Sequence, residues 1–167
     1  NSYQSVPSVI LSFMEKYPNN PNSDMLEDLL IDSYVSSKNY EEAMDLLEKN
    51  KKFENKLAYQ KVAFLRGVEL FDQNKFTDAI RHFDKSLAEP RDREITARAT
   101  YWKAETDYQL GKYAEALIGF KQYEQLPAAN QTPEYALKDY PMGYVEYHLD
   151  HYEQAISHFD AFIKKPN

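Results

Sequence analysis

The sequence repeats one short phrase four times, in the copies NYEEAM (39–44), KFTDAI (75–80), KYAEAL (112–117) and HYEQAI (151–156). Each copy holds an aromatic residue, two mostly polar residues, an alanine and a large aliphatic residue. The alanines are 36, 37 and 39 residues apart (43 to 79, 79 to 116, 116 to 155). Self-similarity at such a period is typical of a helical solenoid, which favours a binding surface over a reaction centre.

Apolar residues follow helical spacing over nearly the whole chain, and no strand-like alternation is sustained. We therefore expect an all-α fold of about nine helices. The first spans about 7–17 and ends at the breaker Tyr17-Pro18-Asn19-Asn20-Pro21. Short loops then predict four antiparallel pairs. The pairs are about 23–36 with 40–52, 55–73 with 76–88, 93–109 with 113–125, and 133–148 with 152–164.

The breaks between pairs predict a single repeat domain over 1–167. Its expected parts are a half repeat (1–21) and four repeats (22–54, 55–92, 93–132 and 133–167). Pro141 falls inside the predicted 133–148 helix. An interior proline removes a backbone hydrogen bond, so we expect a bend or a restart near Asp139.

Composition excludes several classes of function. The net charge is −7 without a basic stripe, which argues against nucleic acids and anionic membrane surfaces. No apolar run approaches the roughly 18 residues that a membrane-spanning helix needs. The chain has no cysteine, which excludes disulfides, thiolate nucleophiles and cysteine-based metal sites.

No motif for catalysis is present, so we expect no enzyme, no metal site and no cofactor. There is no HExxH set, no GxSxG elbow and no glycine-rich phosphate loop. The four histidines are interpreted as surface or groove-edge residues: His82, His148, His151 and His158. Asp107 and Glu146, nine residues before their alanines, are expected to be partly solvated or paired with Lys or Arg.

Counting from the alanines reveals further periodic positions. Four residues later come Leu47, Phe83, Phe120 and Phe159. Twelve residues earlier come Ile31, Gly67, Ala104 and Gly143. Three of these four earlier residues are small, which suits the partner side of a close helix crossing opposite the alanine.

With these positions in register, the chain resembles the tetratricopeptide repeat family. The likeness covers about 23–164 as four repeats, with the N-terminal helix standing for the back half of a fifth. It is closest at LGKYAEAL (110–117), whereas the periods exceed the roughly 34 residues of the common form. The resemblance implies a right-handed α-solenoid that acts as a noncatalytic protein-interaction module.

The resemblance also implies that three positions per repeat point into a concave face, fifteen, eleven and eight residues before the alanine. The first set is Asp28, Phe64, Tyr101 and Tyr140; the second is Asp32, Val68, Glu105 and Tyr144; the third is Val35, Phe71, Tyr108 and Tyr147. One interpretation is an aromatic groove, acidic at one end, for an extended or helical peptide. The other is that these rings mainly pack between repeats.

The charges at the predicted concave-face positions limit the chemical class of partner that we expect. Family members that hold chaperone tails clamp a C-terminal carboxylate, but Asp28 and Asp32 occupy matching positions here and would repel an anion. Arg98 falls at one clamp-like position and does not make a clamp alone. We therefore expect a basic or aromatic protein segment as the partner.

The stretch FMEKYP (13–18), followed by Asn20-Pro21, resembles repeat endings of bacterial envelope tetratricopeptide proteins. This resemblance implies a part of a larger envelope protein in the bacterial periplasm, with the cytoplasm as the alternative. Two rival functions stay open: a structural spacer without a groove ligand, and an assembly module that self-associates through its open helical ends.

Replacing Ala116 with leucine should overpack the expected helix crossing and lower stability by roughly 1–3 kcal/mol. Thermal unfolding of the purified variant measures this loss. An unchanged melting temperature would contradict the assignment of Ala116 to a close helix contact.

Overall fold

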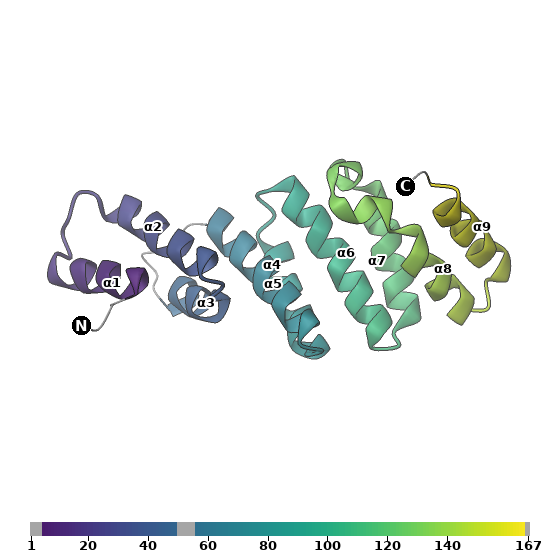
Figure 1. Ribbon diagram of the computed structural model, residues 1–167, viewed down its shortest axis with the longest axis horizontal. Coiled ribbons are helices and arrows are strands. Elements are labelled where there is room, and N and C mark those ends of the chain that lie inside the picture. The colour runs from purple at the N-terminus through teal and green to yellow at the C-terminus, as the bar shows by residue number, and fades with distance from the viewer. Residues whose placement is uncertain (1–4, 50–55, 166–167) are drawn as a thin grey trace.

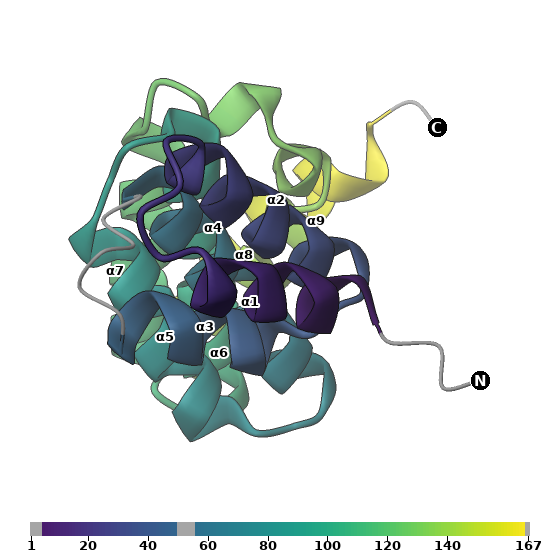
Figure 2. The same ribbon diagram turned by 90° about the vertical axis from the view of Figure 1, so that its left-hand side faces the viewer.

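The computed structural model describes residues 5–49 and 56–165, and within these ranges the chain is helical without any strand. The helices follow one another along an elongated array, with the helix Val6–Lys16 at one end and the helix Tyr152–Ile163 at the other (Figure 1). Seen from the N-terminal end, the array is compact in cross-section (Figure 2). The predicted all-α helical repeat solenoid is confirmed.

The α-helices in the described ranges are α1 Val6–Lys16, α2 Ser23–Ser36, α3 Tyr40–Lys49, α4 Lys56–Asp72, α5 Phe76–Ala88, α6 Arg93–Gln109, α7 Tyr113–Gln125, α8 Asp139–His148 and α9 Tyr152–Ile163. Helices α2, α5, α6 and α7 begin and end at the predicted residues. The predicted end of the 40–52 helix and the predicted start of the 55–73 helix lie outside the described residues. No helix in the described ranges is both long enough and apolar enough to cross a membrane.

The turn within each helix pair has one repeated backbone geometry. The residue five positions before each repeat alanine has a positive φ: Lys38 (58°), Asn74 (59°), Gly111 (72°) and Asp150 (60°). The next N–H donates to the carbonyl five residues earlier, as Lys112 N does to Asp107 O at 2.9 Å. This Schellman-type cap ends the first helix and reverses the chain within two residues.

Within a pair, the helices approach closely where the first helix carries a small residue. A Cβ atom at Gly67 would lie 2.6 Å from the Phe83 ring, and one at Gly143 would lie 2.5 Å from the Phe159 ring. The nearest neighbour of these glycines is therefore the phenylalanine four residues after the repeat alanine. This corrects the expectation that the alanine itself faces them. The aromatic edge needs the space that a glycine leaves.

The repeat alanines fill the interior instead. Ala43, Ala79 and Ala116 are fully buried, and Ala155 is nearly so. Three apolar clusters follow one another along the array, across α1–α4, α4–α6 and α6–α8. Trp102 packs against the second and the third of these clusters and so joins two repeats. Because each cluster draws on neighbouring pairs, no pair buries its apolar face alone.

A buried glutamine connects the second repeat to the third. Gln60 on α4 is fully buried, and its Oε1 accepts from the N–H groups of Arg91 (3.0 Å) and Asp92 (2.7 Å). Its Nε2 donates to Thr96 Oγ1 at 2.9 Å. These hydrogen bonds satisfy backbone N–H groups of the loop that leads into α6, and they fix the N-terminus of that helix relative to α4.

The last pair begins differently from the others. Two short 3₁₀ turns, Ala129–Gln131 and Pro133–Ala136, precede α8, which starts at Asp139. The predicted restart near Asp139 is confirmed. Pro141 is the third residue of α8 rather than an interior residue, so the missing N–H falls in the first turn, where it needs no helical partner.

Replacing Lys38 with glycine should stabilise the protein by roughly 0.5–1 kcal/mol, because glycine adopts a positive φ without the steric cost that lysine has there. Urea denaturation measures the change. The same substitution at Lys75, whose φ is −89°, is the control and should leave stability unchanged or lower. A destabilised Lys38→Gly variant would contradict the importance of this turn geometry.

Candidate functional site

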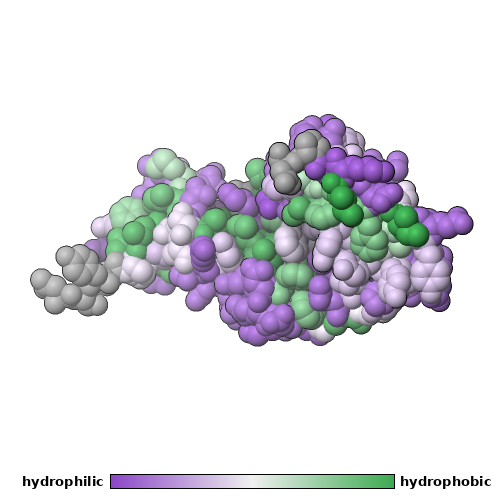
Figure 3. All heavy atoms as spheres, turned by 45° about the vertical axis from the view of Figure 1, so that its right-hand side comes forward, coloured by the Kyte–Doolittle hydropathy of each residue, from purple (hydrophilic) through white to green (hydrophobic). Residues whose placement is uncertain are grey.

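A cavity of about 540 Å³ opens among the first helices of three successive pairs, α4, α6 and α8. We call it the aromatic cavity. Its lining is Phe71, Tyr101, Trp102, Glu105, Tyr108, Gln109, Glu134, Leu137, Tyr140, Pro141, Tyr144 and Phe162. This volume falls within the range of small-ligand and side-chain pockets. On the face in Figure 3, apolar and weakly polar residues form patches between hydrophilic ones.

Two groups of rings form the walls of the aromatic cavity. On one side Trp102 contacts Phe71 edge-on, with ring centroids 5.1 Å apart. On the other side Tyr140 contacts Tyr144 at 5.1 Å and Phe162 at 5.3 Å. Such edge and tilted contacts are favourable geometries for aromatic pairs and hold the rings in place.

Glu105 is one of the two carboxylates that line the aromatic cavity. It lies on α6 one turn after Tyr101 and one turn before Tyr108. Burial raises the pKa of Glu105, a trend that a weak hydrogen bond from Gln109 (3.4 Å) opposes. Its Oε2 is buried without a hydrogen-bond partner among the described residues. Burial also raises the pKa of Tyr101, and the charge of Glu105 raises it further.

The second carboxylate of the lining, Glu134, is fully engaged. Arg98 Nε donates to its Oε1 at 3.0 Å, and Trp102 Nε1 donates to the same oxygen at 2.9 Å. The Arg98 guanidinium also lies 5.0 Å from the centroid of the Phe64 ring. This arrangement fixes the indole orientation and neutralises one of the two carboxylates.

Six of the residues that were predicted for the concave face line the aromatic cavity: Phe71, Tyr101, Glu105, Tyr108, Tyr140 and Tyr144. They come from three helices that lie far apart in the sequence. Tyr101 retains only 6% exposure, so it supports the wall from within the core, whereas Tyr144 is 38% exposed. The structure therefore places Tyr101 in the packing between repeats and Tyr144 at the accessible surface.

The other predicted residues lie outside the aromatic cavity. Asp28 and Asp32 are exposed on α2, and Tyr147 is exposed on α8. Phe64 is buried in the α4–α6 cluster, and Val68 packs against that cluster. Arg98 pairs through its Nε with Glu134 of this chain.

Sequence reasoning missed six lining residues: Trp102, Gln109, Glu134, Leu137, Pro141 and Phe162. Trp102 and Gln109 each follow a predicted position by one residue, so a broader helical face would have included them. Glu134 and Leu137 lie in the segment before α8, outside the repeat register. Only the tertiary structure brings that segment against α6.

Glu146 and Asp107, the two carboxylates nine residues before their repeat alanines, have different surroundings. Glu146 is buried, and its Oε2 lies 2.6 Å from His151 Nδ1. A lysine, Lys121, is more distant, at 4.0 Å, so histidine rather than the expected Lys or Arg is the near partner of Glu146. Burial raises the pKa of Asp107, while the charge of Lys112 opposes the rise. No three metal-ligating side chains gather within residues 5–49 and 56–165.

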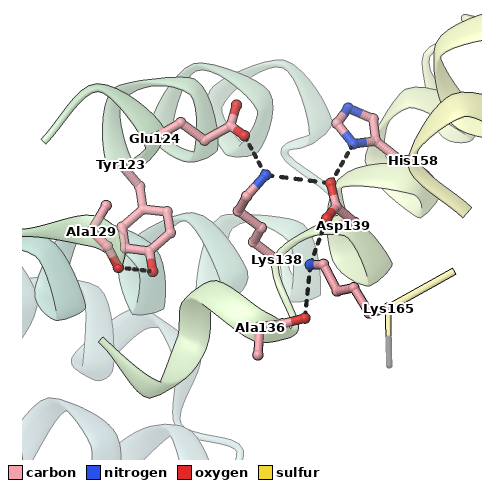
Figure 4. Close-up of polar contacts among 8 residues, drawn as sticks. All are labelled: Tyr123, Glu124, Ala129, Ala136, Lys138, Asp139, His158 and Lys165. Carbon is pink, nitrogen blue, oxygen red and sulfur yellow. Dashed lines mark hydrogen bonds and ion pairs between the residues drawn. The ribbon is translucent and has the colours of Figure 1, made fainter. Parts of the chain in front are cut away.

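A charged cluster around Asp139 anchors the start of α8 (Figure 4). Asp139 is buried, and its oxygens contact Lys165 Nζ at 2.7 Å and His158 Nδ1 at 3.0 Å. Lys138 lies 3.4 Å from Asp139 and also contacts Glu124 on α7. The cluster therefore ties α8 to both α7 and α9, which sets where Tyr140 lies.

A hydroxyl pair holds the preceding loop. Tyr123 is fully buried on α7, and its hydroxyl donates to the carbonyl of Ala129 at 3.1 Å (Figure 4). Thr132 donates to the same carbonyl at 2.7 Å. The loop is thereby fixed against α7, and the segment that carries Glu134 and Leu137 follows it directly.

Comparisons with known proteins agree with this architecture. A family model described as tetratricopeptide repeat matches residues 64–132. Among solved structures, a chain described as "MamA RS-1 ArsTM double mutant" is similar with a TM-score of 0.61 and 16% identity. The similarity covers 95% of this chain and 84% of that chain. At this identity the likeness concerns the fold alone. Curated protein sequences contain no significant match.

The repeat geometry and the family match define the class: residues 64–132 match the tetratricopeptide repeat, and the described helices form a helical repeat solenoid of that kind. Proteins of this class bind protein partners and are typically noncatalytic. A fold of this kind suggests a protein-interaction scaffold.

Asp139 should make stability depend on pH in the acidic range. Burial alone would raise its pKa, but hydrogen bonds from Lys165 and His158 and the charge of Lys138 outweigh burial and lower the pKa from 3.8 to about 2. The stability that the ionised Asp139 carboxylate contributes is fully present above pH 3.8 and is lost as the pH falls through about 2. We expect the ionised Asp139 side chain to contribute roughly 1–2 kcal/mol to the free energy of unfolding at neutral pH.

Chemical denaturation of the wild type and Asp139→Asn at several pH values tests this expectation. The variant should be less stable at pH 7, and the difference should shrink toward pH 2. Asp160→Asn, which alters an exposed ion pair with Lys164, is the control. A difference that stays constant with pH would contradict the role of the Asp139 charge.

Proposed function

We propose that the chain is a noncatalytic interaction module that holds a segment of a partner protein along the first helices of its repeats. The aromatic cavity is the observation that carries the proposal, because it combines rigid rings with few polar groups at the junction of three repeats. Aromatic side chains supply large contact areas at low entropic cost. The negative net charge favours a basic or aromatic segment over an acidic one.

The proposal extends to the setting of the module. We propose that it is part of a larger bacterial envelope protein that acts in the periplasm, with the cytoplasm as the alternative. The support is the likeness of FMEKYP (13–18) to repeat endings of envelope proteins. Fractionation of the source cells, followed by detection with an antibody against this chain, tests the setting.

A second candidate function is self-association through the ends of the array. The observation in its favour is that large apolar side chains are exposed on the terminal helices, with Val9 and Phe13 on α1, and Ile156 and Ile163 on α9. Exposed apolar groups at the ends of a solenoid can stack on another copy. Light scattering over a range of concentrations tests this alternative, and a monomer at high concentration excludes it.

The proposed peptide groove predicts that peptide affinity depends on the exposed ring of Tyr144 and not on the exposed ring of Tyr147. Peptides selected against the purified protein from a random display library are labelled, and their affinity is measured by fluorescence anisotropy. Tyr144→Ala should weaken binding by at least about fivefold, because it removes a ring from the aromatic cavity. Tyr147→Ala removes a more exposed ring from the same helix and should change affinity by less than about twofold.

Tyr101 is unsuitable for this comparison, because truncating a buried core ring would also lower stability. Equal loss of affinity in both exposed-ring variants would place the contact elsewhere on α8. Unchanged affinity in both would contradict binding at the aromatic cavity.

A further inference from the structure

We infer that the aromatic cavity binds a cationic side chain, lysine or arginine, of a partner segment, with Glu105 as its counter-ion. The inference rests on the proposed function and deepens it, because it names the chemical group that the site recognises.

The first observation is the unsatisfied carboxylate. Glu105 Oε2 is buried, and among the described residues no hydrogen-bond donor reaches it. Its other oxygen has only a long contact with Gln109. A buried acceptor without a partner is unfavourable. Because Oε2 is shielded from solvent in the free protein, the carboxylate must rotate toward the cavity for a ligand N–H to reach it, and the ligand then supplies the interaction that the free protein lacks.

The second observation is the aromatic surround. Tyr101 and Tyr108 lie on the same face of α6 as Glu105, and Trp102 and Tyr144 complete the opposing walls. A ring face attracts an ammonium or guanidinium group through its quadrupole, and the attraction grows when water is excluded. Rings around one carboxylate therefore suit a cation better than a neutral group.

The third observation is the charge of the lining. The described residues that line the aromatic cavity include two carboxylates and no basic side chain. Glu134 already pairs with Arg98, which leaves Glu105 as the available anion. An acidic ligand would therefore meet an uncompensated carboxylate, whereas a basic one would meet its counter-ion.

The size and composition of the cavity indicate how such a side chain enters. A volume of about 540 Å³ exceeds that of one lysine or arginine side chain. The remaining space accommodates neighbouring residues of the partner segment. Leu137 and Phe162 offer apolar surface for the aliphatic stem, which long basic side chains bury while their charged ends find polar partners.

Trp102 provides the readout, because it is the only tryptophan of the chain and lines the aromatic cavity. Its fluorescence is recorded while n-butylammonium or n-butylguanidinium chloride is added at constant ionic strength, which keeps general screening fixed. Butan-1-ol is the neutral analogue and sodium butyrate is the anionic one. We expect a saturable response to both cations, at concentrations at least about tenfold below any response to the other two probes.

Glu105→Gln isolates the carboxylate, since it keeps the shape of the side chain and removes the charge. Cation affinity should fall at least about tenfold. Glu94→Gln makes the same charge change in the first turn of α6, outside the aromatic cavity, and should leave affinity within about twofold. Circular dichroism confirms that both variants are folded, and a fold retained with unchanged cation affinity in Glu105→Gln overturns the inference.

A second pair of variants tests the rings. Tyr144→Leu should weaken cation binding while Tyr147→Leu should not, because only Tyr144 lines the aromatic cavity. An equal response to butan-1-ol and to the cations would mean that the site is a general apolar pocket, which overturns the inference.

The selected peptides separate this inference from the proposed function. Selected peptides in which one lysine or arginine is essential, and whose binding requires Glu105, support both. Selected peptides that lack basic residues and bind Glu105→Gln as tightly as the wild type overturn the cation site and leave the interaction module intact. Saturable, Glu105-dependent cation binding without any selected peptide supports the cation site and counts against the peptide groove.

Discussion

The close approach of the two helices in each repeat is the constraint on which the rest of the structure depends. In the second and fourth pairs the rings of Phe83 and Phe159 lie against Gly67 and Gly143, and in the third pair Gly119 lies against Ala104. A larger residue at any of these glycines would push the second helix outward. Because neighbouring pairs share apolar clusters, such a shift would spread along the array.

This spacing also determines what the first helices present. Helices α4, α6 and α8 lie near enough that rings from all three meet around the aromatic cavity. Their separation is held by polar contacts between repeats: Gln60 holds the entry to α6, and Lys138 ties the start of α8 to Glu124 on α7. The site therefore depends on side chains that never touch a ligand, since they place the rings that do.

The polar groups of the lining differ in how well they are satisfied. Glu134 has three hydrogen bonds from Arg98 and Trp102, so it contributes to the architecture. Glu105 keeps a buried oxygen unpaired among the described residues. Native proteins rarely leave such a group without a reason, and an incoming cation supplies one. The same chain thus uses one carboxylate to build the cavity and offers the other to a partner.

The amino-acid sequence alone determined the helices, their pairing and the register of the repeats, because these follow from local spacing and from short turns. It also predicted the restart at Asp139 from one proline. Only the tertiary structure decided that Glu134 and Leu137 join the cavity, since they lie outside the repeat register. It likewise decided that Tyr101 is buried while Tyr140 is exposed, because both occupy the same predicted concave-face position of their repeats and the repeat register does not show how neighbouring segments cover them.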